Sequence, residues 1–461
     1  MTDRFPPGFE AQVRHDVRRY DDGLLVGGSP LRAMRLGTEA RRRIIDGRVL
    51  VQDPTDEELA ARLVDGNLAD PVHHGAGPDP DDLSVIIPIR DRPAQLSRAL
   101  AALRGLRCIV VDDASHDPRA VARVAAEHGA RVLALPVNSG PAAARNAGLA
   151  VVETPFVALV DSDVQADAAM LRRLARHFAD DKVALVGPLV RSRARTANPR
   201  WFERYDEQVS SLALGRRACS VRPGAAVGWL PSACLVARVD RLRAAGGFAE
   251  DMRVGEDVDL VWRLVTSGEV VRYDPDEVAW HDTRATIGGW LGRKFLYGTG
   301  GADLASRHGR KGAPAVMSPT MAVTAAALLA GRPWSLPVAA VGLITAVHSL
   351  DRRLPESPHR RGLAVRLGAQ GLGWAVRQET ALLLRHWWPL AAVAASGSSS
   401  VRRALVSALV VDVVVARIDH PDAPYDPLSR RLDDLAYGAG LWAGALRARS
   451  LGALAPRRPG S

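Results

Sequence analysis

The fold is decided by residues 83–115, which read LSVIIPIRDRPAQLSRALAALRGLRCIVVDDAS. An apolar run from Leu83 to Ile89 is followed by Pro93, by leucines at helical spacing, and then by a second apolar run from Cys108 to Val111. Two short apolar runs joined by an amphipathic segment are typical of a βαβ unit. The segment therefore predicts two parallel strands joined by a helix.

The same alternation continues toward the C-terminus. We expect a helix over 117–128, a strand over 131–135, a helix over 140–151 and a strand over 156–160. This pattern predicts an α/β domain with a parallel-rich sheet flanked by helices, which we place at 83–311. Ligands of such sheets bind at the carboxyl ends of the strands, so the residues that follow each apolar run are candidate site residues.

A small separate module is expected ahead of this domain, over residues 1–70. It contains a candidate strand from Leu24 to Val26 and candidate short helices over 40–45 and 56–68. Residues 71–82 are rich in proline, glycine and aspartate, which is the composition of a linker.

The C-terminal region, 312–461, is predicted to be helical and partly apolar. Two uncharged, alanine-rich stretches, 312–331 and 333–350, are long enough to cross a bilayer, but both contain proline and glycine. A membrane span, a buried helical hairpin and a segment lying against a membrane surface therefore remain open. A third apolar run, 404–415, is short and contains Asp412.

The charge of +10 and the pI near 10.2 do not by themselves indicate a nucleic-acid partner. Of the 61 basic residues only Lys182, Lys294 and Lys311 are lysines, and the arginines are spread along the chain. This pattern indicates a compositional bias rather than a phosphate-binding patch, so we expect no nucleic-acid binding.

The cysteines and the N-terminus indicate a reducing compartment. Cys108, Cys219 and Cys234 are odd in number and lack metal-ligand spacing. The first residues lack the apolar stretch of a secretory signal. We therefore expect a cytoplasmic protein, with association to the inner face of the membrane left open by the apolar C-terminal stretches.

Two candidate nucleotide-binding segments follow the predicted strands. Asp112 and Asp113 end the second apolar run and suit hydrogen bonds to a base or ribose, although Asp113 or Ser115 could equally cap the helix that begins near Asp117. The helix that opens at Gly140 carries Arg145 on its first turns, which suits an anionic phosphate.

Three further acidic or histidine-bearing segments carry candidate chemistry. Asp161 and Asp163 follow the apolar strand 156–160, and such a carboxylate pair can hold Mg²⁺ or Mn²⁺ together with substrate phosphates. The segment GEDVD at 255–259 puts acids in the first turn of a helix, where they also favour the helix dipole. His281 follows an expected strand over 270–278 and becomes a candidate third metal ligand only together with Asp161 and Asp163.

Together these motifs resemble those of the inverting family-2 glycosyltransferases of the GT-A fold, over roughly residues 83–300. The resemblance implies a metal-dependent enzyme that transfers a sugar from a nucleotide diphosphate donor to an acceptor hydroxyl. It also implies a role for each motif: nucleotide-sugar binding by Asp112, Asp113, Gly140, Arg145 and Asp161, metal binding by Asp161, Asp163 and His281, and general-base catalysis by Asp257.

The sequence departs from the usual family pattern at two places. Ala114 stands where glycine is more usual, and the Q-x-x-R-W signature of processive polysaccharide synthases is absent around residues 290–297. A long-chain synthase is therefore disfavoured. Glu256, Arg293, Lys294 and Tyr297 are candidate contacts to the acceptor or the diphosphate.

A narrower resemblance is to the glycosyltransferases of mycofactocin biosynthesis, carried by the N-terminal module, Arg90-Asp91, the segment GEDVDLVWR and Tyr297-Gly-Thr-Gly. It implies transfer of β-linked glucose from UDP-glucose to a small-molecule or peptide-derived acceptor, namely a peptide-derived redox cofactor. Residues 1–70 are also similar to small winged-helix modules that hold precursor peptides.

Other functions fit less well. A glycosyltransferase for a cell-envelope glycan or lipid is one alternative, and a nucleotidyltransferase is the nearest rival of another enzyme class. A nucleotidyltransferase lacks its glycine-rich basic loop here, and a dinucleotide-dependent dehydrogenase lacks G-x-G-x-x-G. An inactive peptide-docking scaffold would leave the acidic motifs unexplained.

Overall fold

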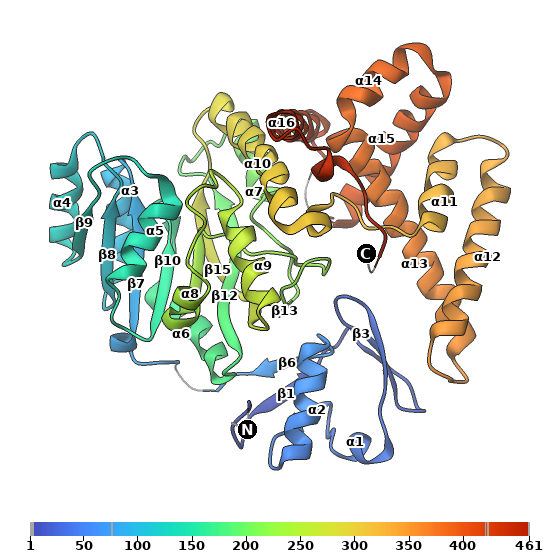
Figure 1. Ribbon diagram of the computed structural model, residues 1–461, viewed down its shortest axis with the longest axis horizontal. Helices are drawn as coiled ribbons and strands as arrows, with labels where there is room; N and C mark the ends of the chain where they lie inside the picture. Colours follow the sequence, from blue (N-terminus) through green and yellow to red (C-terminus); the bar gives the residue numbers. More distant parts are fainter. Residues whose placement is uncertain (1–3, 75–76, 420, 422–423, 460–461) are drawn as a thin grey trace. The chain divides into compact units, whose positions relative to one another are not determined.

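The computed structural model describes residues 4–74, 77–419, 421 and 424–459. The chain forms two compact units (Figure 1). The first comprises Met1–Pro199 and Val209–Thr283, and the second comprises Arg200–Gln208 and Arg284–Ser461.

The first unit is built on a mixed sheet with the strand order β11-β15-β12-β14-β10-β7-β8-β9, and β13 pairs with β15. Strands β10, β7, β8 and β9 are parallel, and β14 runs antiparallel to both of its neighbours. The predicted βαβ alternation is confirmed. The strands are β7 (Leu83–Ile89), β8 (Arg107–Asp112), β9 (Arg131–Ala134), β10 (Phe156–Val160), β11 (Val164–Gln165), β12 (Val183–Arg193), β13 (Cys219–Ser220), β14 (Cys234–Arg238) and β15 (Val270–Asp282).

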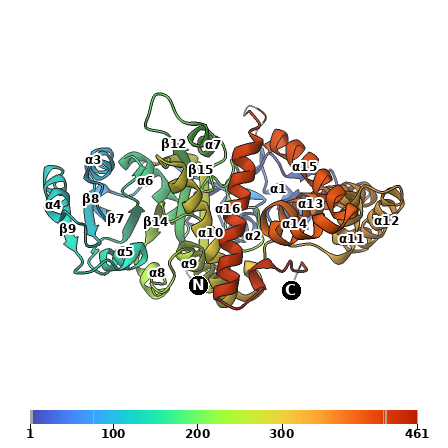
Figure 2. The ribbon, with the colours of Figure 1, turned by 90° about the horizontal axis from the view of Figure 1, so that it is seen from above.

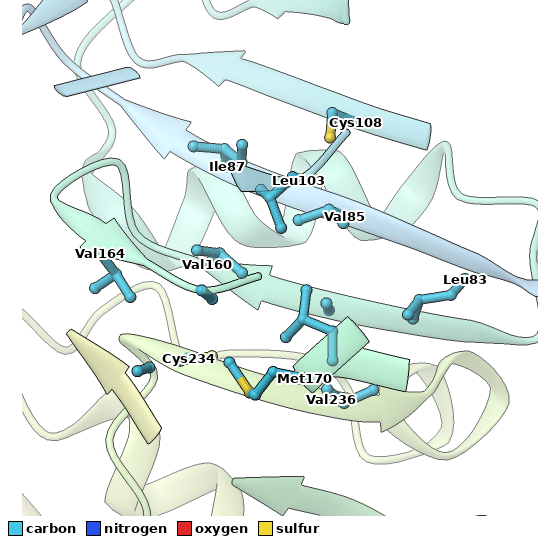
Figure 3. Packing of buried hydrophobic residues seen from close by; sticks show 14 of the residues in the cluster. Leu83, Val85, Ile87, Leu103, Cys108, Val160, Val164, Met170, Cys234 and Val236 are labelled. Atoms are coloured by element: carbon cyan, nitrogen blue, oxygen red, sulfur yellow. The ribbon is translucent and has the colours of Figure 1, made fainter. Parts of the chain in front are cut away.

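Helices cover both faces of this sheet (Figure 2). On one face α3 (Pro93–Ala102) and α6 (Ala168–Ala175) bury their leucines against valines of the strands. Figure 3 shows part of this cluster, where Leu103 and Met170 lie against Val85, Val160 and Val236. The other face carries α5 (Gly140–Ala150), α8 (Val239–Ala244) and α9 (Glu256–Thr266), and α4 (Pro118–Glu127) lies beyond α3.

Residues 4–72 form two small sheets and two helices around a core of their own. The sequence predicted one strand and two helices here, whereas most of the strands were missed because they are only two to four residues long, and several of them contain arginine. β6 also continues to Val72, inside the segment expected to be a linker. The elements are β1 (Glu10–Val13), β2 (Arg18–Arg19), β3 (Leu24–Gly27), β4 (Arg32–Arg35), α1 (Thr38–Arg42), β5 (Arg48–Leu50), α2 (Pro54–Asp65) and β6 (Ala69–Val72).

The second unit is helical. Its first long helix, α10 (Ile287–His308), packs against α16 (Pro427–Arg447) so closely that a Cβ atom at Gly298, Gly440 or Gly444 would collide with backbone of the other helix. The remaining helices are α7 (Trp201–Gln208), α11 (Pro319–Ala330), α12 (Ser335–Arg353), α13 (Arg360–Ala381), α14 (Trp388–Gly397) and α15 (Ser399–Asp419).

The two alanine-rich stretches of the C-terminal region become α11 and α12, which pack against each other and against α13. Over the described ranges, none of the helices combines the length and the apolar character that crossing a membrane requires.

Candidate active site

The sheet brings the predicted motifs to one edge. Ile89 at the end of β7 pairs with Asp112 at the end of β8, and Val160 at the end of β10 pairs with Cys234 at the start of β14. His281 was expected beyond a strand but lies inside β15, where it pairs with Val164 of β11. The residues that follow β7, β8 and β10 therefore lie at the same edge as His281.

On the nucleotide side of this edge, Asp112 and Asp113 are buried and accept hydrogen bonds from backbone amides. Asp113 accepts from the N–H groups of Ser139 (2.7 Å) and Gly140 (2.8 Å), and Asp112 accepts from Ser115 (3.0 Å). The amide of Gly140 is therefore committed to Asp113.

The alternative that Asp113 or Ser115 caps the helix beginning near Asp117 was wrong. Asp117 itself caps α4 by accepting from the N–H of Ala120 (3.0 Å), because it directly precedes the first helical residue. Asp113 instead holds the start of α5.

The loops after β7 and β8 are locked together. Asp91 donates its N–H to Ser115 Oγ (2.7 Å) and accepts from the N–H of His116 (2.8 Å). Asp91, Arg92 and Ala114 all have φ between 53° and 63°, the left-handed region that favours glycine. This explains why glycine is more usual at position 114, and strained backbone of this kind gathers at functional sites.

Arg145 is the centre of a buried acidic cluster. Its guanidinium donates to Asp161 Oδ1 (2.6 Å) and to Glu256 Oε1 (3.0 Å), and it lies 5.3 Å from the ring centroid of Phe248. Although burial disfavours its charge, the two carboxylates raise the pKa of Arg145. The side chain thus neutralises the first acid of the D-x-D pair instead of pointing into open solvent.

Asp257 lies beside this cluster at the start of α9. Gly255 precedes the helix with φ of 87°, which turns the chain so that Asp257 Oδ2 accepts from Ser232 N–H (3.2 Å) and Oδ1 accepts from Val258 N–H (2.8 Å). The side chain is partly exposed, yet surrounding protein and the adjacent Glu256 raise the pKa of Asp257 to about 7. A carboxyl with this pKa can accept a proton near neutral pH.

The third acid of the GEDVD segment has a different environment. Asp259 is only 1% exposed and pairs with Arg263 Nε (2.8 Å), one turn along α9. Arg263 in turn donates to the carbonyl oxygens of Ala245 and Gly247. Asp259 therefore ties α9 to the loop after α8.

Asp163, in the turn between β10 and β11, lies next to His281 of β15. His281 Nε2 is 3.6 Å from Asp163 Oδ1, and the buried His281 Nδ1 has no hydrogen-bond partner. Arg92 Nη1 donates to Asp163 Oδ2 (3.2 Å). Within the part of the chain that the structure describes, no three His, Cys, Asp or Glu side chains converge as a complete metal site.

The candidates on α10 belong to the second unit. Arg293 lies over the Tyr297 ring at 5.7 Å from its centroid. Lys294 is buried and pairs with Asp206 (3.1 Å) and Asp433 (3.0 Å), so it stabilises the helical packing and is not a free contact for an acceptor or diphosphate.

Two residues at the edge were not singled out from the sequence. Arg92 pairs with Asp163, and the N–H of Ser232 reaches Asp257. The basic sequence Arg90-Asp91-Arg92 directly after the first strand was a usable signal for Arg92. A backbone donor such as Ser232 leaves no signal in side-chain chemistry.

Comparisons with known proteins bear on this arrangement. The model of "Glycosyl transferase family 2" matches residues 84–224, and that of "Glycosyl transferase family group 2" matches residues 156–408. The pre-mycofactocin glycosyltransferase of Mycobacterium tuberculosis is 42% identical, and the match covers 98% of each chain. The chain belongs to glycosyltransferase family 2. Family-2 enzymes use nucleotide-sugar donors, and the mixed sheet with its acidic edge is the GT-A-like fold expected from the sequence.

More distant relatives were also found. The succinoglycan biosynthesis protein ExoU of Rhizobium meliloti is 29% identical over 41% of this chain and 58% of its own. Among solved structures, a mannosyltransferase from Pyrobaculum calidifontis in complex with GDP-Man and Mn²⁺ is 18% identical, with a TM-score of 0.43 over 81% of this chain and 89% of its own. GalNAc-T7 with UDP, GalNAc and Mn²⁺ is 11% identical, with a TM-score of 0.35 over 49% and 50%.

Proposed function

We propose that this family-2 glycosyltransferase moves glucose from UDP-glucose to a hydroxyl of pre-mycofactocin and inverts the anomeric centre to give a β-linkage. The observation that carries the proposal is the match to the pre-mycofactocin glycosyltransferase across nearly the whole of both chains. Such a match includes the N-terminal module and the whole helical region, whereas the two family models match residues 84–224 and 156–408.

Asp257 is the proposed general base. As the acceptor oxygen attacks the anomeric carbon, Asp257 takes the hydroxyl proton, and the bond from that carbon to the diphosphate breaks on the opposite side. The backbone donors Ser232 and Val258 fix the carboxylate, and its pKa of about 7 keeps a large fraction ionised at neutral pH.

The donor is proposed to bind across the edge formed by Asp112, Asp113 and the start of α5. Arg145 does not contact the donor in this proposal; it holds the carboxylates of Asp161 and Glu256 in place through hydrogen bonds. Glu256 is thereby a positioning residue for the base, and Arg293 and Tyr297 stay proposed contacts to the acceptor or diphosphate.

The chain's own residues suit a divalent ion, Mg²⁺ or Mn²⁺, that takes part of its coordination from the donor. Asp163 and His281 supply adjacent oxygen and nitrogen donors, and Asp161 supplies a further carboxylate two residues away. A bound ion would neutralise charge on the departing diphosphate.

Residues 1–70 are proposed to hold the acceptor or its peptide precursor. The module packs on the sheet domain through buried polar contacts: Arg4 pairs with Asp180 (2.8 Å), and Asn67 Oδ1 accepts from the N–H of Ser220 (2.6 Å). Deleting it would strip these partners, so substitutions on its exposed surface make a sharper experiment than truncation.

Leu31→Glu with Arg32→Glu, at the exposed start of edge strand β4, should raise KM for the acceptor and leave UDP release by donor hydrolysis unchanged. Arg123→Glu, exposed on α4, is the matched control. An unchanged KM for the acceptor in the double variant would remove the module from acceptor binding.

The proposed compartment is the cytoplasm. The three cysteines are buried and form no disulfide, which suits a reducing environment.

The test of function is incubation of the full chain with UDP-glucose and pre-mycofactocin, followed by mass spectrometry for added hexose. UDP-galactose and GDP-mannose serve as donor controls, and a cell-envelope lipid serves as the acceptor control. Hexose transfer to the lipid but not to pre-mycofactocin would overturn the acceptor, and transfer only from GDP-mannose would overturn the donor.

A further inference from the structure

An exposed apolar stripe runs along α15 in the helical unit. Its six side chains are between 37% and 70% exposed, at spacings of one, three or four residues that keep them on one side of a helix. We call this set the α15 stripe: Val406, Leu409, Val410, Val413, Val414 and Ile418.

The opposite side of α15 is fixed to its neighbours. Ala408 is fully buried, and Asp412 accepts from Arg430 (2.8 Å) and Arg431 (2.6 Å) of α16. Helices α11, α13 and α14 also contact α15, and α14 lies beside it in Figure 1. Because these contacts set the rotation of α15, the stripe faces away from the helical core.

Both ends of the stripe are basic. Arg402 lies one turn before Val406, Arg417 lies one turn after Val414, and both are exposed on the same side of the helix. The only acid near the exposed side, among the described residues of α15, is Asp419 at its end, which pairs with Arg377 (2.6 Å). From its first to its last member the stripe extends about 18 Å at the helical rise of 1.5 Å per residue.

The arginines at the two ends favour an anionic membrane over a second copy of the chain as the partner of the α15 stripe. If two copies met through the stripe in antiparallel orientation, Arg402 of one would approach Arg417 of the other, and in parallel orientation each arginine would meet its own counterpart. Either arrangement places like charges together at both ends. An anionic bilayer instead offers an apolar acyl-chain layer in which the valines can be buried and anionic phosphates with which both arginines can pair.

We propose that the α15 stripe docks on the surface of an anionic membrane, with its apolar side chains at the boundary of headgroups and acyl chains. Arginine can lay its methylene stem along the apolar layer while its guanidinium stays with the phosphates. The helix lies in the plane of the surface, since its other side is occupied by α16 and the neighbouring helices. This surface is separate from the proposed transfer chemistry and does not rest on it.

The test is cosedimentation of the full chain with phosphatidylcholine vesicles, with and without phosphatidylglycerol. The parent should bind vesicles that contain phosphatidylglycerol at low salt and bind pure phosphatidylcholine far less. Val410→Glu should weaken this binding at least 10-fold, because it places a charge at the apolar boundary. Ile45→Glu is the matched control, since it also replaces an exposed β-branched apolar side chain with glutamate, in the other unit, and its vesicle binding should stay within about twofold of the parent.

A second variant keeps the result interpretable if Val410→Glu folds poorly. Arg402→Gln with Arg417→Gln should weaken binding roughly fivefold per arginine and should reduce its salt dependence. The proposal is overturned if phosphatidylglycerol does not increase vesicle binding by the parent protein, or if Val410→Glu binds vesicles as tightly as the parent. A parent dimer that Val410→Glu converts to a monomer in analytical ultracentrifugation would assign the stripe to self-association instead.

Discussion

Two groups of carboxylates lie at the same edge of the sheet and are held in opposite ways. On the nucleotide side, Asp112 and Asp113 are satisfied by backbone amides of neighbouring loops. At the base of α9, Asp161 and Glu256 share one buried guanidinium, and Asp257 stands beside them with a raised pKa. Asp112 and Asp113 fix loops, whereas burial and the neighbouring Glu256 give Asp257 a proton affinity that chemistry can use.

The largest effect is expected from Asp257→Asn. Removing the proposed base keeps the shape of the side chain and should lower the transfer rate about 10²- to 10⁴-fold, with UDP binding close to the parent and a melting temperature no lower than the parent's. Steady-state kinetics, titration with UDP and thermal melting measure these three quantities. Asp259→Asn is the control and should keep most activity, although its buried pair with Arg263 makes it less stable. Turnover by Asp257→Asn within about threefold of the parent would move the base elsewhere.

The next effect concerns the metal. Excess chelator, or Asp163→Ala, should lower transfer about 10²-fold or more, because the diphosphate would leave without a counter-charge. Isothermal titration of Mn²⁺ in the presence of UDP gives a second measurement that does not depend on turnover. Full activity and unchanged Mn²⁺ binding in Asp163→Ala would exclude this carboxylate as a ligand.

On the nucleotide side the expected effect is on stability. Asp113→Ala removes the acceptor for the amides of Ser139 and Gly140. Because water can reach these two amides, the loss should be about 0.5–1.5 kcal/mol, the net contribution of a typical hydrogen bond. Urea denaturation measures the loss. If Asp113→Ala unfolds at the same urea concentration as the parent, Asp113 does not stabilise the start of α5, and the contrast with the acids around Arg145 is wrong.

The smallest effect is a shift in pH dependence. Transfer should rise with pH through about 7 as Asp257 ionises, and Glu256→Gln should move this rise to lower pH, because a negative neighbour is removed. The same raised pKa means that Asp257 favours folding at acidic pH and that this contribution is lost as pH climbs toward 7. The melting temperature of Asp257→Asn relative to the parent should therefore increase between pH 5 and pH 8. An unshifted rate profile in Glu256→Gln would show that Glu256 does not tune the base.

Much of the sheet domain could be predicted from sequence because its strands are buried on both faces and read as continuous apolar runs. Both ends of the strand from Phe156 to Val160 were predicted correctly, and Asp161 and Asp163 follow it as expected. The small sheets of the N-terminal module escaped prediction because strands of two to four residues, several of them arginine, give no alternating pattern.

The candidate site was predictable in its residues but not in its pairings. Local sequence identified Arg145 and Glu256 separately, yet they are 111 positions apart and only the folded sheet brings them together. Likewise, the end of β15 was predicted at Val278, whereas pairing with β11 and β12 carries the strand through His281 to Asp282. Pairing partners distant in sequence decide such boundaries.

The glycine contact between α10 and α16 has a consequence for how the chain is made. Helix α10 ends at His308 and its partner begins at Pro427, about 120 residues later. At a synthesis rate of about 5–20 residues per second, α10 leaves the ribosome roughly 6 to 24 seconds before α16 exists. During that interval the glycine-lined side of α10 lacks the helix that covers it in the folded protein, so the helical unit cannot be completed until α16 has been synthesised.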